Sequence, residues 1–147
     1  MKFKNSKGFT LIELLIVVAI IGIIAVIAIP QLLNAIDRGK QKRTMADMRS
    51  VGTALGTYQV DNSQFVVGAV SVLETQLETG GYMGVVPTTD GWNNAYTYAG
   101  AISSYSLSSG GKDGGTDHST DNNFDKYDFN HTITLSNGVF TAAPASN

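Results

Sequence analysis

One charged residue interrupts a long apolar run near the N-terminus of this sequence. The run begins after Gly8 and extends to Pro30, and Glu13 is the one charge within it. A charged side chain at the centre of a membrane helix costs roughly 2.5 to 3.5 kcal/mol even on lenient scales. Glu13 is therefore expected either to pair with an opposite charge or to reach water or take up a proton near a helix end. In the first case its chemistry is ion pairing between subunits.

A second set of carboxylates lies near the C-terminus. Glycine, serine, threonine and asparagine separate its members and argue against a helix, so we expect a loop. Carboxylate and carbonyl oxygens in such a loop can surround Ca²⁺, which takes 6 to 8 oxygen ligands. The spacing is not that of an EF-hand, and a solvated acidic loop without metal is the alternative interpretation. The four residues recur every fourth position: Asp113, Asp117, Asp121 and Asp125.

The residue types that enzymes use are sparse. The chain has no cysteine, which excludes disulfides, thiolate metal sites and a cysteine nucleophile. His118 stands alone in a polar stretch, and His131 falls in an expected strand. Nucleophile-elbow, phosphate-loop and His-Glu-x-x-His patterns are missing from the sequence. We therefore expect no enzymatic activity. The acidic balance beyond Arg49 likewise gives no reason to expect nucleic-acid binding.

The element that positions Glu13 is an apolar helix. Phe9 to Leu33 comprises 25 residues with a single charge, about 37 Å of helix, and a hydrocarbon core is roughly 30 Å thick. A removable secretory signal would be shorter and would end in a small-x-small cleavage site, which Ile29-Pro30-Gln31 is not. A plain membrane anchor explains the length but not Glu13.

The helical pattern continues beyond the apolar run. Apolar residues recur there at spacings of three and four, which predicts an amphipathic helix with one face for a globular partner. The expected helix runs from Phe9 to about Tyr58, with weak points at Gly22 and Pro30. The apolar stripe consists of Met45, Met48, Val51, Leu55 and Tyr58.

The remaining sequence predicts a small α+β domain. Asp61-Asn62-Ser63 is typical of a helix exit turn, and Val72 to Gly81 of a short helix stopped by glycine. Asn137-Gly138 between β-prone runs predicts a two-residue hairpin. We expect an antiparallel sheet packed on the amphipathic part of the long helix. Its strands are predicted at 95–98, 104–107, 132–135 and 139–140.

At the N-terminus, Lys7-Gly8-Phe9-Thr10-Leu11-Ile12-Glu13, with Pro30 downstream, resembles the leader junction of type IV prepilins and pseudopilins. The resemblance implies cleavage after Gly8 by a prepilin peptidase and N-methylation of Phe9. It implies that Glu13 neutralises the Phe9 amine of a neighbouring subunit and so sets the filament register. It also implies that the helix loosens between Gly22 and Pro30 on packing.

A second resemblance lies in the C-terminal domain. Asp90-Gly91-Trp92-Asn93-Asn94-Ala95-Tyr96 is similar to the Asp-Pro-Trp-Gly-Asn-Pro-Tyr segment of the major pseudopilin of type II secretion, with both prolines and the middle glycine replaced. In that family the loop downstream binds calcium. Asp113 matches the family position, and Asp117, Asp121 or Asp125 would supply a second carboxylate.

Four regions follow from this interpretation: a cleaved leader (1–8), a hydrophobic helix (9–33), its amphipathic continuation (34–60) and an ectodomain (61–147). The expected protein is a structural subunit, the major one, of a type II secretion pseudopilus or a type IV pilus. Its expected partners are further copies of itself, the peptidase, an inner-membrane assembly platform, minor pilins and, before assembly, membrane lipid. The N-terminus is expected in the cytoplasm and the ectodomain in the periplasm or, in a pilus, at the cell surface. The alternative is a single-pass anchored module that binds calcium or another ligand and does not polymerise.

Overall fold

The computed structural model describes residues 8–115 and 128–144. These residues form one long helix, one short helix and a four-stranded antiparallel sheet of order β1-β2-β3-β4. The expected α+β arrangement, a long N-terminal helix with a small antiparallel sheet, is confirmed. In chain order the elements are α1 (Leu11–Asn62), α2 (Val70–Thr79), β1 (Thr97–Gly100), β2 (Tyr105–Ser109), β3 (Ile133–Ser136) and β4 (Val139–Ala142).

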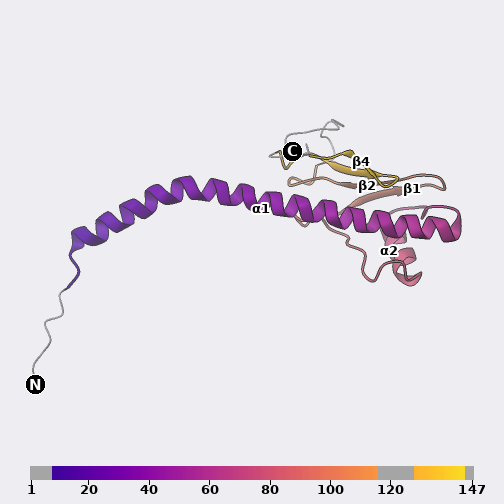
Figure 1. Cartoon of the computed structure of the whole chain (residues 1–147), viewed down its shortest axis with the longest axis horizontal. Coiled ribbons are helices and arrows are strands. Elements are labelled where there is room, and N and C mark those ends of the chain that lie inside the picture. Colours follow the sequence, from indigo (N-terminus) through magenta and orange to yellow (C-terminus); the bar gives the residue numbers. More distant parts are fainter. Residues whose placement is uncertain (1–7, 116–127, 145–147) are drawn as a thin grey trace, which may run out of the picture. The chain divides into compact units, whose positions relative to one another are not determined.

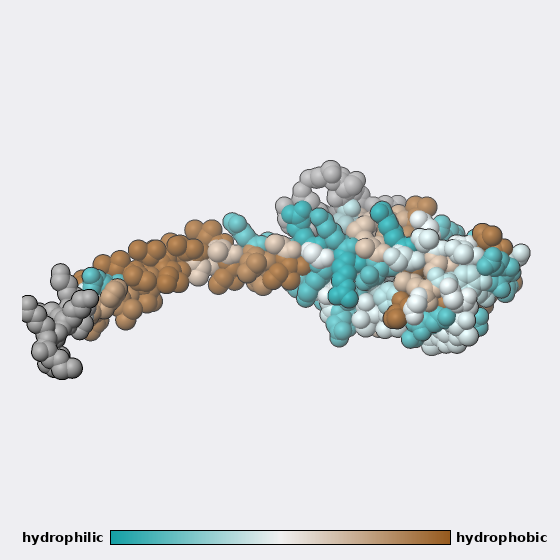
Figure 2. All heavy atoms as spheres, turned by 60° about the horizontal axis from the view of Figure 1, so that its bottom comes forward, coloured by the Kyte–Doolittle hydropathy of each residue, from teal (hydrophilic) through white to brown (hydrophobic). Residues whose placement is uncertain are grey.

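The chain divides into two compact units, one ending at Ala35 and one beginning at Ile36. In the first unit the large apolar side chains of α1 are exposed, and Figure 2 shows them as an almost continuous hydrophobic surface. α1 is long and apolar enough to cross a membrane, and none of its most apolar window is buried. Soluble helices bury one apolar stripe, so apolar exposure all round indicates a lipid or protein environment for this unit.

α1 ends later than the sequence predicts. The predicted end was near Tyr58 with an exit turn at 61–63, but Asp61 and Asn62 are still helical. The helix stops at Ser63, whose φ is +59°. The Asn62 side-chain amide donates to the Tyr58 carbonyl oxygen at 3.0 Å, which satisfies one of the carbonyls that a helix end leaves open.

β1, β2 and β3 begin one or two residues after their predicted starts, and β4 begins at Val139 as predicted. Ala95 pairs with Thr89 in an isolated bridge, and the Tyr96 N–H donates to the Thr88 carbonyl at 2.9 Å. These two residues therefore belong to a loop that folds back on itself, and β1 starts only at Thr97. The predicted hairpin is present: Asn137 and Gly138 have φ of +49° and +82°, as a turn with two left-handed residues requires.

The core of the second unit lies between α1 and the sheet, which Figure 1 shows running along this half of the helix. The two layers approach closely at Gly52. A Cβ there would lie 2.8 Å from Leu135 Cδ2 and 2.9 Å from the Tyr105 hydroxyl. Deeply buried apolar side chains come from α1, α2 and the sheet, among them Met48, Val51, Leu55, Leu73, Leu77, Leu107, Ile133 and Leu135.

Candidate functional site

Glu13 forms a capping box at the start of α1. Its Oε2 accepts hydrogen bonds from the Thr10 N–H at 2.8 Å and the Thr10 hydroxyl at 2.6 Å. In return, the Glu13 N–H donates to Thr10 Oγ1 at 3.3 Å. This reciprocal pairing satisfies two backbone donors at the helix start. The Thr10-x-x-Glu13 spacing is the sequence pattern of a capping box. The sequence reasoning missed it because it considered only the charge of Glu13. In a single chain the carboxylate therefore already has a partner.

The other predicted N-terminal positions are placed as follows. Gly8 and Phe9 precede α1 and are exposed, with 79% of Phe9 accessible. Gly22 and Pro30 lie inside α1, and the helix is continuous through both. A Cβ at Gly22 would meet no atom within 4 Å. Gly22 therefore makes no close contact in a single chain. The roles of these four residues in processing and packing stay predictions.

In the second unit, a loop headed by Asp90 joins the sheet to α1. Asp90 is buried, and its Oδ1 accepts from the N–H groups of Trp92 and Asn94, both at 2.9 Å. Its Oδ2 accepts from the Ser109 hydroxyl at 2.6 Å. The Asn94 side-chain amide donates to the Gly111 carbonyl at 2.7 Å. The segment similar to the pseudopilin motif thus shapes a turn and ties it to the end of β2.

At Gly91 this loop packs directly against the backbone of α1. Its N–H donates to Thr44 Oγ1 at 2.9 Å, and Thr44 is fully buried. A Cβ on Gly91 would lie 2.5 Å from the Lys40 carbonyl oxygen and 2.9 Å from its carbon. Helix backbone cannot move aside as the end of a side chain can, so this position requires glycine.

Asp37 is a buried carboxylate that sequence reasoning did not single out. Its Oδ1 accepts from Trp92 Nε1 at 3.0 Å, and its Oδ2 lies 2.8 Å from Lys112 Nζ. Burial opposes ionisation of Asp37, but the hydrogen bonds from Lys112 and Trp92, together with the Lys112 and Lys40 charges, hold its pKa below the ordinary value. Asp37 therefore stays charged and fastens both the Asp90 loop and Lys112 to α1. Two features of the sequence could have drawn attention to Asp37: it is a carboxylate just beyond the apolar run, and the chain has a single tryptophan that could pair with it.

The calcium expectation falls mostly outside the described residues. Asp117, Asp121 and Asp125 lie there, as does His118. Asp113 directly follows Lys112, is exposed, and accepts the Gly115 N–H on its Oδ1 at 3.0 Å. Within 8–115 and 128–144, no group of three or more His, Cys, Asp or Glu side chains is arranged to hold a metal ion. The carboxylate oxygens of Asp113 are of the kind that calcium binds, and a calcium site here stays a prediction.

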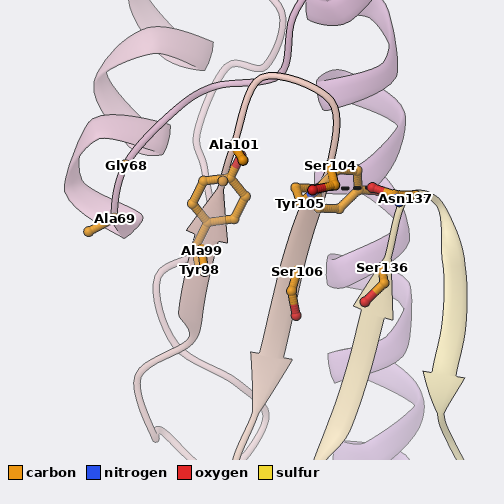
Figure 3. Close-up of a pocket in the computed structure, with 11 residues that line it drawn as sticks. Gly68, Ala69, Tyr98, Ala99, Ala101, Ser104, Tyr105, Ser106, Ser136 and Asn137 are labelled. Atoms are coloured by element: carbon orange, nitrogen blue, oxygen red, sulfur yellow. Dashed lines mark hydrogen bonds between the residues drawn. The ribbon is translucent and has the colours of Figure 1, made fainter.

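The cavity shown in Figure 3 has a volume of about 560 Å³ and opens at one end of β1, β2 and β3. The two tyrosines that line the cavity make hydrogen bonds to the backbone of other segments. The Tyr98 hydroxyl donates to the Val66 carbonyl at 2.7 Å, and the Tyr105 hydroxyl accepts from the Gly138 N–H at 2.8 Å. Asn137 Oδ1 accepts from the Tyr105 N–H at 2.9 Å. The described residues that line it are glycine, alanine, serine, tyrosine and one asparagine.

Comparison with known families gives two matches that together cover most of the chain. Residues 3–29 match the prokaryotic N-terminal methylation motif. Residues 31–125 match the type II secretion system protein G family. The first match contains Gly8, Phe9 and Glu13, and the second contains Asp37, the Asp90 loop and Asp113.

Individual relatives match this chain over different lengths. The chain is 33% identical to the type II secretion system core protein G of Pseudomonas aeruginosa, over 82% of this chain and 96% of the relative. It is 30% identical to the core protein G of Vibrio cholerae, over 78% and 88%. Identity with the type IV major fimbrial protein FimA of Dichelobacter nodosus is 53%, but over only 40% of this chain and 38% of the relative. No solved structure gives a significant match.

Proposed function

The chain belongs to the type II secretion system protein G family and is a filament structural subunit, and from this premise we propose that it is the major subunit of a type II secretion pseudopilus. The observation that carries the proposal is the extent of the matches. The core protein G relatives of Pseudomonas aeruginosa and Vibrio cholerae align over 96% and 88% of their length, whereas FimA aligns over 59 residues, 38% of its length. A single-pass anchored module that does not polymerise is not favoured by these relatives. Deleting the protein should abolish secretion of exported enzymes; loss of surface filaments with secretion intact would instead assign it to a pilus.

Maturation begins with cleavage after Gly8. Both residues of the bond are exposed ahead of α1, where a peptidase can reach them. The new N-terminus, Phe9, is then methylated. Mass spectrometry of the mature chain tests this step: the expected N-terminal peptide starts at methylated Phe9, and an intact Met1 would contradict it.

Assembly exchanges the partner of Glu13. In one chain the carboxylate is held by Thr10, and in the filament it pairs with the Phe9 amine of a neighbour. Two groups that are unfavourable in a membrane then become one ion pair, and only one axial offset between subunits permits it. Breaking a buried pair by removing one partner typically costs about 3 to 5 kcal/mol. Glu13→Ala should therefore abolish filaments recovered by shearing or pull-down, and normal filaments from this variant would refute the mechanism.

The subunit waits in the inner membrane with its N-terminus in the cytoplasm and its ectodomain in the periplasm. α1 supplies the spanning segment, in contact with lipid before assembly. An ATP-driven platform, with minor pilins at the tip, then extracts it into the filament. The segment from Gly22 to Pro30 loosens during packing, because glycine and proline weaken the helix there.

Calcium orders the acidic loop in this proposal. Asp113 and one or more of Asp117, Asp121 and Asp125 would hold the ion, and the Asp37–Lys112 ion pair at 2.8 Å fixes the loop entrance on α1. Thermal melting of the full chain with calcium, and again with a chelator, tests the site. Calcium should raise the melting temperature of the wild type and not of Asp113→Ala. Equal melting of the wild type in both conditions would remove the site.

A further inference from the structure

Asn130 lies in a pattern that neither the filament nor the calcium proposal uses. Asn130-His131-Thr132 is the one Asn-x-Ser/Thr triplet in the 147 residues, and this triplet is the acceptor for N-linked sugars in exported proteins. Asp128, two residues before the asparagine, accepts the Asn130 N–H and so holds the turn that contains the triplet. We propose that Asn130 is a glycosylation site of the exported ectodomain.

The structure presents Asn130 to solvent. It lies in the turn that precedes β3 and is exposed, whereas Phe129 and Ile133 on either side are buried. The side-chain amide of Asn130 makes no hydrogen bond to another residue within 8–115 or 128–144. Because Asn130 is exposed, a sugar attached to its Nδ2 displaces no core contact.

The turn itself holds the acceptor in place. Asp128 Oδ1 accepts the Asn130 N–H at 3.2 Å, and Asp128 Oδ2 lies 3.0 Å from His131 Nδ1. Phe129 packs against Trp92, with ring centroids 6.4 Å apart, and its carbonyl accepts the Lys112 N–H at 2.7 Å. Because Phe129 and β3 anchor both sides, a glycan on Asn130 has a fixed base on the surface of the domain.

The reaction required is a glycosyl transfer without redox change. Asn130 Nδ2 attacks the anomeric carbon of a sugar linked to a polyprenyl diphosphate. The bond from that carbon to the diphosphate oxygen breaks, the polyprenyl diphosphate leaves with the electron pair, and the amide proton passes to a base of the transferase. The Thr132 hydroxyl, at the third position of the triplet, is the group by which the transferase recognises the acceptor. The reaction rests on the proposed topology, since the ectodomain must reach the compartment of the lipid-linked sugar.

The test uses the full chain purified from its own host. Lys126 is the last lysine or arginine, so trypsin releases the peptide Tyr127–Asn147 with the acceptor inside it. Most of this peptide is expected to carry the mass of a glycan. Asn130→Gln and Thr132→Ala should lose the added mass. Thr132→Ser keeps the recognised hydroxyl, so this variant should keep the added mass. Comparing it with Thr132→Ala separates loss of recognition from misfolding.

Two results would overturn the assignment. One is an unmodified Tyr127–Asn147 peptide in the purified chain, when protease added to spheroplasts of the same cells digests the ectodomain. Digestion by added protease shows that the ectodomain has been exported. The other is a glycan that persists on Asn130→Gln. If added protease cannot reach the ectodomain at all, the proposed topology fails and this inference fails with it.

Discussion

Replacing Asp37 with alanine should destabilise the second unit by about 2 to 4 kcal/mol. Two contacts are lost. The hydrogen bond from Trp92 Nε1, at 3.0 Å to a buried carboxylate, is of a kind that contributes about 1.5 to 3 kcal/mol. The ion pair with Lys112 adds about 0.2 to 1 kcal/mol, because half of the lysine side chain is in solvent. The hydrogen bond from Trp92 is thus the larger part.

Trp92 is the only tryptophan in the chain, so its fluorescence reports on this site directly. The assay is urea unfolding of the full-length chain in detergent, followed by that fluorescence. Asp47→Ala is the matched control. Asp47 also lies on α1 and pairs with a basic residue, Arg43, but at 3.6 Å and with 75% of the arginine side chain exposed. The control should change the free energy of unfolding by about 0.5 kcal/mol or less. Both variants gain the same helix propensity from alanine, so that effect cancels in the comparison.

The effect of Asp37 also depends on pH. Its pKa is lowered in the folded state, so its contribution is present above the pKa of the unfolded chain, about 3.9. The contribution is lost as pH falls through the lower folded-state value. The gap in unfolding free energy between wild type and Asp37→Asn should therefore be constant near neutral pH and shrink below about pH 4. Equal unfolding of Asp37→Ala and Asp47→Ala at pH 7 would refute the reasoning.

Other contacts give further predictions. Gly91→Ala should lower the free energy of unfolding by about 3 kcal/mol in the same urea assay, because its Cβ would meet helix backbone 2.5 Å away. Gly84→Ala is the control, since a Cβ there meets nothing within 4 Å. Equal stability of the two variants would contradict the close approach at Gly91. Thr10→Ala removes the capping hydroxyl, worth about 1 kcal/mol, and should speed amide exchange in the first turn of α1 roughly five-fold in detergent. Thr10→Ser should leave that exchange unchanged, and an unchanged rate in Thr10→Ala would show that the box is not formed in solution.

The elements were largely predictable because their signals are local. Apolar residues at spacings of three and four predict that Met48, Val51 and Leu55 share one buried face of α1. Asn137-Gly138 supplies the two left-handed residues of the β3–β4 turn. The exact ends were not predictable. α1 continues to Asn62, and β1 begins at Thr97, because contacts with distant or neighbouring loops outweigh local preference at element ends.

The sequence alone determined the long apolar helix with Glu13 near its start, the α+β order of elements and the motif that marks the family. Each of these depends on residues close together in the chain, where composition and spacing act directly. Only the tertiary structure showed Asp37 buried against Trp92 and Lys112, 55 and 75 positions away. It alone showed Gly91 resting on the Lys40 backbone and Asn130 exposed between buried neighbours. Contacts between distant segments are set when helix and sheet pack together, and no local pattern encodes which side chains then meet.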